Sequence, residues 1–210
     1  MPAPSPWSFW RIARIAAAVV VLIAAAYYLV VAFDNITNPT NPNGGNWPFV
    51  EGVLSGEGTP PDNGFEWRFI DAAWFHVLAY IGIIAGEALA GVLLLIGGIA
   101  GIRGASSAQR WEPGQRWTLI GGVVGLLVFF LGFIVVGGNW FIMYENAKWN
   151  GLEPAFQNTV TTLLAMLLVL GAAIGGRLAE RGCGAVERRA LRTPRSRRVP
   201  PRPRPRAARR

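Results

Sequence analysis

A single carboxylate lies near the middle of a long apolar stretch, where charged side chains are rare. That residue is Glu87, within the apolar run at residues 72–102. A carboxylate at the centre of a membrane-spanning helix is energetically costly, so such residues usually face the interior of a bundle or carry a proton. Glu87 therefore indicates either a proton or cation site, or a glutamic acid that hydrogen-bonds a neighbouring helix.

Few side chains are placed to interact with Glu87. Tyr27 and Tyr28 are the expected hydrogen-bond donors, because they lie somewhat outward of mid-span in the first apolar run. His76 lies eleven residues before Glu87, close to three helical turns, so the two should share a helix face about 16 Å apart. This spacing fits a proton relay, a quinone-head contact or, as we favour, a histidine satisfied at the wet interface beside Asp71.

The sequence lacks the residues that most kinds of catalysis need. One cysteine, Cys183, and one histidine leave no cluster for zinc or iron–sulfur, and no bis-histidine haem within the chain. The sequence also lacks a nucleophile–base pair, a phosphate-binding loop and a carboxylate pair at a usable spacing. We therefore predict a protein that is not an enzyme and has no cofactor.

Membrane-spanning helices are the elements predicted to position these residues. Of the 210 residues, 52% are hydrophobic and only 15% are charged, which is too apolar for a soluble domain of this size. About 20 apolar residues cross a hydrocarbon layer roughly 30 Å thick. We predict an all-α, four-helix integral membrane bundle over residues 12–176, preceded by residues 1–11, with spans at residues 12–33, 72–102, 117–137 and 155–176.

The distribution of arginine predicts the orientation of the bundle. Basic residues are enriched in cytoplasmic segments. Arginines precede the first span, separate the second from the third and follow the fourth, whereas the loops at residues 34–71 and 138–154 are acidic. We expect both termini in the cytoplasm and a long extracytoplasmic loop between the first two helices. A bacterial inner (plasma) membrane is the simplest location.

The first apolar run has a second interpretation. Arg11 and Arg14 precede it, and residues 24–26 (Ala-Ala-Ala) satisfy the small-x-small rule for cleavage of a signal peptide. The apolar run continues through residues 27–31, which favours an uncleaved span. The remaining topology is the same in either case.

The two outward loops share the tetrapeptide Gly-Gly-Asn-Trp, at residues 44–47 and 137–140. It indicates either two like-oriented hairpins or a chance repeat of residue types common at outer span ends. Residues 47–54 are apolar enough to lie along the interface or to cap the bundle, and a fixed loop there would form the floor of an outward cavity. The candidate recognition residues of these loops are Asn46, Trp47, Phe49, Asn139 and Trp140.

The C-terminal segment, residues 177–210, is predicted to be a basic, disordered cytoplasmic tail. It holds 13 of the 20 basic residues, and arginine alternates with proline near its end. Such an arm can bind anionic lipid headgroups or act only as a topology anchor. Nucleic-acid binding is disfavoured because no stacking aromatic accompanies the arginines. The candidate lipid contacts are Arg195, Arg197, Arg198, Arg202, Arg204 and Arg206.

A set of residues in the loops and spans resembles a bacterial family of predicted small integral membrane proteins of unknown function. In chain order they are Asn46, Phe49, Val50, Val53, Leu54, Trp67, Arg68, Tyr80, Glu87, Trp140, Phe141, Met143, Asn150, Gly151, Ala155 and Phe156. This chain has Ser55-Gly56-Glu57 where that family has Met-Asp, and Gln157 where it has Arg. The resemblance covers roughly residues 12–176, and it implies the four-helix architecture without a reaction.

We expect a non-enzymatic accessory or structural subunit that packs in a larger membrane complex or as a homo-oligomer. One alternative is a small proton- or cation-coupled transporter that uses Glu87. A second alternative is a lipid- or quinone-binding membrane subunit at the outer leaflet.

Overall fold

The computed structural model describes residues 8–40 and 46–192, with side chains up to residue 182. Within these ranges the chain forms helices and connecting segments and no strand. Four helical stretches are long and apolar enough to cross a membrane. They are α1 (Phe9–Thr37), α3 (Ala73–Gly104), α4 (Ala108–Leu126) with its continuation η2 (Leu127–Trp140), and α5 (Leu152–Arg192).

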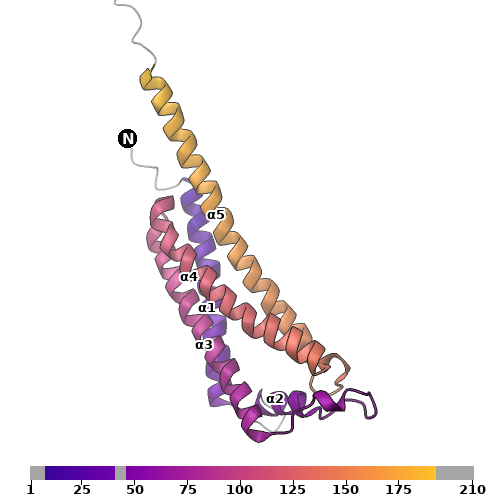
Figure 1. Ribbon diagram of the computed structural model, residues 1–210. Coiled ribbons are helices and arrows are strands. Elements are labelled where there is room, and N and C mark those ends of the chain that lie inside the picture. Colours follow the sequence, from indigo (N-terminus) through magenta and orange to yellow (C-terminus); the bar gives the residue numbers. More distant parts are fainter. Residues whose placement is uncertain (1–7, 41–45, 193–210) are drawn as a thin grey trace, which may run out of the picture.

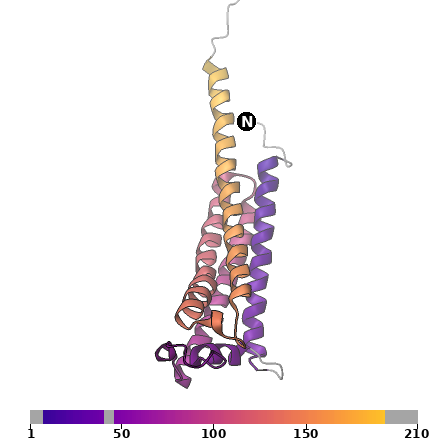
Figure 2. The same cartoon turned by 90° about the vertical axis from the view of Figure 1, so that its right-hand side faces the viewer.

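The bundle has two distinct ends (Figures 1 and 2). The short helix α2 (Asn46–Ser55) lies across one end, together with the segments that join α1 to α3 and η2 to α5. We call this the loop end. The opposite end, which we call the terminal end, carries the start of α1, the α3–α4 turn and the last part of α5, which extends beyond the other helices.

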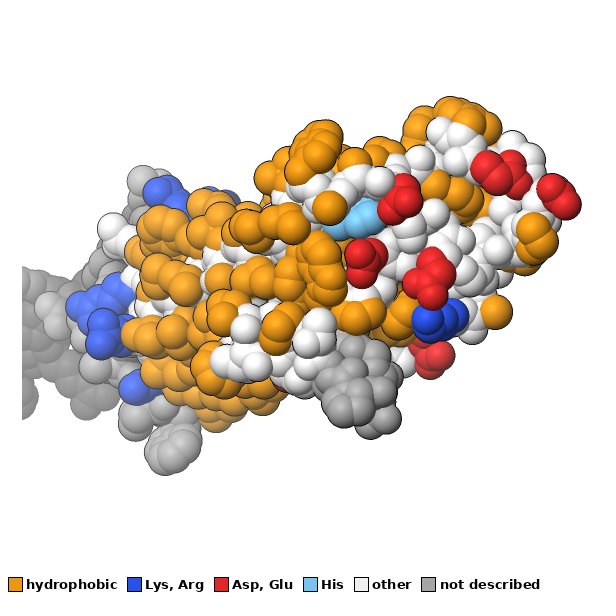
Figure 3. All heavy atoms as spheres, turned by 90° about the horizontal axis from the view of Figure 1, so that it is seen from below, with side chains coloured by type: hydrophobic (Ala, Val, Ile, Leu, Met, Phe, Trp, Pro, Cys, Tyr) orange, Lys and Arg blue, Asp and Glu red, His pale blue; other side chains and the backbone are white. Residues whose placement is uncertain are grey.

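Large apolar side chains cover the outside of the long helices. On α1, for example, Ile23, Val30 and Phe33 are all strongly exposed. Figure 3 shows hydrophobic side chains over the middle of the molecule, with basic side chains toward one side and acidic side chains toward the other. An apolar surface of this extent is unfavourable in water but suits a lipid environment. The chain is therefore built as an integral membrane helical bundle.

Small residues let α1, α3 and α4 approach one another closely. Ala18 and Ala25 of α1 and Ala90 of α3 are buried in the core. Gly101 of α3 and Gly114 of α4 face each other, and a Cβ on Gly114 would lie 2.5 Å from the backbone nitrogen of Gly101. Close backbone contact through small residues is a typical packing mode in membranes, where apolar burial gives little driving force.

The helices extend further than the apolar runs that predicted them. The helix α1 continues to Thr37, and α4 begins at Ala108, so the α3–α4 turn is only residues 105–107. The hydroxyl of Ser107 caps α4 by accepting the backbone N–H of Arg110 at 3.3 Å. Helix α5 is continuous to Arg192, which corrects the prediction of disorder for residues 177–192, whereas residues 193–210 lie outside the described residues. Hydropathy locates the lipid-facing part of a helix, whereas in α5 good helix formers such as Arg, Ala, Glu and Leu extend the helix beyond its apolar run.

The segment at residues 47–54 caps the bundle. It forms most of α2, and its apolar face is buried at the loop end against α3 and the segment after η2. The residues of this cluster are Val50, Val53, Leu54, Tyr80, Phe141 and Met143.

The repeated tetrapeptide does not mark equivalent structures. In the first copy the described residues, Asn46 and Trp47, begin α2, whereas residues 137–140 end η2. One copy therefore opens a surface helix and the other closes a long span. The interpretation of two like-oriented hairpins gains no support from this repeat.

Candidate functional site

A cavity of about 480 Å³ lies in the loop-end half of the bundle. Helices α1, α2, α3 and α5 and the π-helical segment η2 all contribute to its wall, so it depends on the complete fold. Most of the wall is apolar, with Ile83, Phe129 and Phe133 among the lining side chains. Its volume falls in the range of roughly 300–1,000 Å³ that is usual for small-molecule sites.

Glu87 supplies a buried carboxyl group to this cavity. Its side chain is 2% exposed, and its Oε2 accepts a hydrogen bond of 2.6 Å from Nδ2 of Asn35 on α1. The hydroxyl of Tyr80, two turns from Glu87 on α3, donates to the Asn35 carbonyl oxygen at 2.7 Å. Within the described part of the chain, Asn35 is the only hydrogen-bond partner of Glu87, and no cationic side chain pairs with it.

The prediction that Tyr27 or Tyr28 donates a hydrogen bond to Glu87 is wrong. The Tyr28 hydroxyl pairs instead with Oγ1 of Thr162 on α5 at 2.8 Å, and Tyr27 is 45% exposed on the outer face. The reason is the length of α1, which remains helical past its apolar run. Asn35 lies two helical turns beyond Tyr28 on the same face, and it is Asn35 that reaches Glu87.

His76 lies outside the cavity. Its side chain is buried near the start of α3, and its Nε2–H donates to the Ile70 carbonyl oxygen at 2.6 Å. The histidine therefore links α3 to the segment before it. The prediction that His76 lies at the wet interface is wrong, because the side chain is buried. His76 and Glu87 are both buried on α3, but the structure does not bring them into one site.

Three of the five predicted recognition residues lie at or beside the cavity. Asn46 and Phe49 of α2 line it, and Nδ2 of Asn46 donates to Asp34 at 3.3 Å. Trp47 packs edge-on against Tyr80, with ring centroids 5.5 Å apart. Helix α2 thus contributes both polar and aromatic groups to the loop-end wall.

Asn139 and Trp140 lie at a different place, at the end of η2. The rings of Trp140 and Trp67 are 5.7 Å apart, and the Arg68 guanidinium lies 4.3 Å from the Phe65 ring centroid. Arg68 also donates to the Asn139 carbonyl oxygen at 3.3 Å. These contacts join the first long loop to the end of η2, and they form a surface cluster of the kind found at membrane interfaces.

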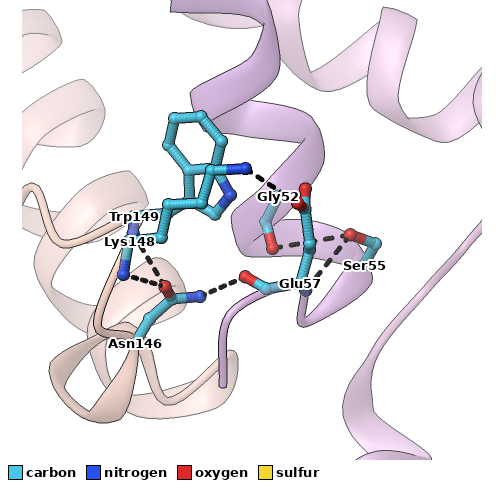
Figure 4. Close-up of polar contacts among 6 residues, drawn as sticks. All are labelled: Gly52, Ser55, Glu57, Asn146, Lys148 and Trp149. Atoms are coloured by element: carbon cyan, nitrogen blue, oxygen red, sulfur yellow. Dashed lines mark hydrogen bonds and ion pairs between the residues drawn. The ribbon is translucent and has the colours of Figure 1, made fainter. Parts of the chain in front are cut away.

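A group of polar contacts fastens α2 to the segment before α5 (Figure 4). We call Glu57, Asn146 and Lys148 the loop clasp. The Asn146 Nδ2 donates to the Glu57 carbonyl oxygen at 2.7 Å, and its Oδ1 accepts the backbone N–H groups of Lys148 at 3.0 Å and Trp149 at 2.7 Å. The Trp149 ring lies against Gly52 of α2, where a Cβ would not fit. The clasp thereby holds the helix that covers the cavity.

An exposed ion pair completes the loop clasp. Lys148 Nζ lies 2.8 Å from Glu57 Oε1, and this ammonium holds the pKa of the Glu57 carboxyl below its usual value. A carboxyl whose pKa is lowered on folding stabilises the folded state above its ordinary pKa, and this contribution is lost as pH falls through the lowered value. Acidification should therefore loosen the clasp.

Replacing Asn146 with alanine is expected to loosen the loop clasp by about 1 kcal/mol, since the four hydrogen bonds of its side chain are lost. Hydrogen exchange of the backbone amides at residues 147–149 should then become about tenfold faster. The control is Asn139→Ala, because that amide bonds only the Ile134 carbonyl within η2. Equal exchange at residues 147–149 in both variants would contradict the role assigned to Asn146.

Sequence reasoning also missed a polar junction at the terminal end. Arg14, predicted only to orient the first span, is 2% exposed and pairs with Glu180 of α5 at 3.0 Å. The same Glu180 oxygen accepts the Ala108 backbone N–H at 2.9 Å, so one carboxylate joins three helices. The signal available in the sequence was Glu180, one of two acidic residues in a strongly basic segment.

The structure adds several lining residues that the sequence reasoning did not select. For Asn35, the signal was its seven-residue separation from Tyr28 on the buried face of α1; for Tyr80 it was a seven-residue separation from Glu87. Phe129, Phe133 and Asn158 gave no signal, because their position depends on how η2 and α5 diverge from α1 and α3.

Two further features concern metal ligands and the arginines of the C-terminal segment. Within residues 8–40 and 46–182, no group of three or more His, Cys, Asp or Glu side chains is placed to hold a metal ion. The six arginines predicted to contact lipid, residues 195–206, lie outside the described residues, so their role stays a prediction.

Comparison with known proteins gives one match. The model of a family described as "Predicted small integral membrane protein (DUF2165)" matches residues 13–171. No curated protein and no solved structure matches significantly. The matched segment includes every residue that lines the cavity and stops before the last part of α5.

Proposed function

The chain belongs to this family of predicted small integral membrane proteins, and from that premise we propose that it binds a small amphiphilic membrane molecule in the cavity around Glu87. This is the lipid- or quinone-binding alternative predicted from the sequence. It does not exclude the accessory-subunit interpretation, because a ligand-binding subunit can also belong to a larger complex.

The observation that carries this proposal is a buried carboxyl group on the wall of a cavity of about 480 Å³. The space is a partly open recess, since Val30 on its wall is 64% exposed, and an apolar recess with a few polar groups is the usual form of a ligand site. A carboxyl group with a single protein partner adds a cost in a low-dielectric environment. A ligand that fills the recess and bonds to Glu87 would cover its apolar wall and offset this cost.

The walls of the cavity support access from the side of the bundle. At Tyr28 and Thr162, α1 and α5 are in contact. Toward the loop end, Val30 and Val31 of α1 and Asn158 of α5 border the cavity. We therefore propose that the ligand enters from the bilayer between these two helices.

A co-purification experiment tests the binding function. Ile83 lines the cavity, whereas Ile81 on the same helix is exposed on the outer face. Ile83→Trp should fill the cavity, and Ile81→Trp is the matched control. Small molecules extracted from protein purified in mild detergent should include a species that the parent and Ile81→Trp retain and Ile83→Trp lacks. Identical extracts from all three proteins would overturn the proposal.

We further propose that the loop end is extracytoplasmic and that both termini lie in the cytoplasm. The support is the positive-inside rule, since acidic residues predominate at the loop end and arginines at the terminal end. A location in a bacterial inner membrane follows the same reasoning.

Cysteine labelling checks this orientation. In a Cys183→Ser background, Pro61→Cys should react with a membrane-impermeant maleimide in intact cells, because residue 61 is exposed in the first long loop. Gln109→Cys, exposed near the α3–α4 turn, should react only after the membrane is permeabilised. The reverse pattern would contradict the orientation.

The transporter alternative has a narrower basis. It requires that the cavity open alternately to both sides, and Phe129 on the cavity wall packs against Tyr28, with ring centroids 5.6 Å apart. A transporter would need to separate these rings. We keep proton- or cation-coupled transport as the second candidate because Glu87 is the residue that it would use.

A further inference from the structure

The cavity has a second, apolar compartment beside it. This compartment has a volume of about 190 Å³ and lies between α2, α3 and η2. It shares Phe49, Val50, Ile83 and Phe133 with the wall of the larger cavity. Phe49 and Phe133 stack with their centroids 6.1 Å apart and their planes at 16°. The two compartments are therefore neighbours that meet at this pair of rings.

Acidic side chains determine the charge of the larger compartment. Glu87 and Asp34 both line it. No lysine, arginine or histidine lines it, among the residues for which side chains are described. A ligand that carries a positive charge would supply the counter-charge that this wall lacks.

Most of the polar side chains of this compartment have already used a donor within the protein. Asn35 donates to Glu87, Asn46 donates to Asp34, and the Tyr80 hydroxyl donates to the Asn35 carbonyl oxygen. The second oxygen of Glu87 is bonded by none of the described residues, although the side chain is buried. Each asparagine amide keeps a further N–H donor, but the two carboxylates give the wall an excess of negatively charged acceptors.

From this arrangement we propose that the occupant is a single-chain organic amine, with its ammonium group at Glu87 and Asp34 and its apolar chain beyond Phe49 and Phe133 in the second compartment. The proposal rests on the proposed ligand-binding function and specifies the chemistry of the ligand. An ammonium group forms charge-assisted hydrogen bonds with carboxylates, which are about twice as strong as neutral ones. The apolar compartment shields the chain.

Other membrane amphiphiles match these walls less well. A quinone headgroup presents carbonyl acceptors, which can bond the amides of Asn35, Asn46 and Asn158 but supply no positive charge to the two carboxylates. A phosphate headgroup would place a negative charge beside Glu87 and Asp34. Both molecules would bring acceptors to a wall that is already rich in acceptors.

Equilibrium binding of labelled probes tests this inference. The full-length protein is placed in nanodiscs of phosphatidylcholine, and binding of dodecylamine is compared with that of dodecanol, which has the same chain and no charge. Binding to Ile83→Trp nanodiscs is subtracted as partition into the bilayer. Parent protein should bind dodecylamine saturably and at least about tenfold more tightly than dodecanol.

Substitutions of Glu87 and Asp34 test whether these carboxylates cause the preference for dodecylamine over dodecanol. Glu87→Gln keeps an acceptor for Asn35 but cannot pair with an ammonium group, so it should weaken dodecylamine binding about tenfold and leave dodecanol binding unchanged. Asp34→Asn should act in the same direction. Equal binding of the two probes, or dodecylamine binding that both variants leave unchanged, would overturn the inference. Either result would leave the proposed function intact if Ile83→Trp still removes the co-purifying molecule.

Discussion

Gly114→Ala is expected to destabilise the bundle by about 1–3 kcal/mol, the range typical of overpacked interiors. A Cβ at this position would lie 2.5 Å from the backbone nitrogen of Gly101, 2.7 Å from its Cα and 2.9 Å from the Gly97 carbonyl oxygen. These are backbone atoms of α3, which cannot turn aside as a side chain can. The methyl group should therefore force α3 and α4 apart, and the midpoint of thermal unfolding in detergent should fall.

Gly171→Ala is the matched control. This glycine is on α5, and no atom of the described residues lies within 4 Å of a Cβ placed there. Both substitutions gain helix propensity, about 1 kcal/mol at exposed helical sites, so only the contact differs between them. If Gly114→Ala and Gly171→Ala melted at the same temperature, the close α3–α4 contact would be wrong.

Glu87→Leu is expected to destabilise the protein by about 1–2 kcal/mol, near the upper range for interhelical polar contacts in membranes. The Asn35 side chain is buried, and without Glu87 its amide donor has no acceptor among the described residues. Glu87→Gln should stay close to the parent, because the carbonyl oxygen of glutamine still accepts that hydrogen bond. Thermal unfolding in detergent measures all of these variants.

A double-mutant cycle isolates the Glu87–Asn35 contact. Asn35→Leu removes the donor, and the double variant Asn35→Leu, Glu87→Leu removes both partners and leaves neither unpaired. The double variant should lose less stability than the sum of the two single variants, by about 0.6–2 kcal/mol. Strictly additive losses would mean that Asn35 and Glu87 do not interact.

The four long apolar helices could be predicted because each lipid crossing needs about 20 apolar residues, which is a local property of the sequence. The partner of Glu87 could not be predicted in the same way. The apolar run of α1 ends at Phe33, and the helix continues through Asn35 to Thr37. The next residue, Asn38, precedes Pro39, and a residue before proline disfavours the helical conformation. Pro39, rather than hydropathy, therefore determines where helix α1 ends. The resulting length of α1 places Asn35 next to Glu87.

The cavity depends on features that no local pattern encodes. The apolar segment at residues 47–54 led us to expect a capping loop that forms the floor of a cavity, and Phe49 of this segment lines the cavity that the structure contains. Its other walls arise where η2 and α5 separate from α1 and α3, which is a property of long-range packing. His76 illustrates the same limit, since helical periodicity gave its face, but the backbone carbonyl of Ile70 determined its role.

Photo-crosslinking in intact membranes tests most directly whether the cavity holds a small amphiphile. A diazirine-bearing aliphatic residue at Ile83 reports the cavity, and the same residue at Ile81 reports the surrounding lipid. The account predicts one discrete adduct at position 83, which added dodecylamine displaces, and a mixture of bulk phospholipids at position 81. The same phospholipid mixture at both positions, insensitive to dodecylamine, would contradict the account.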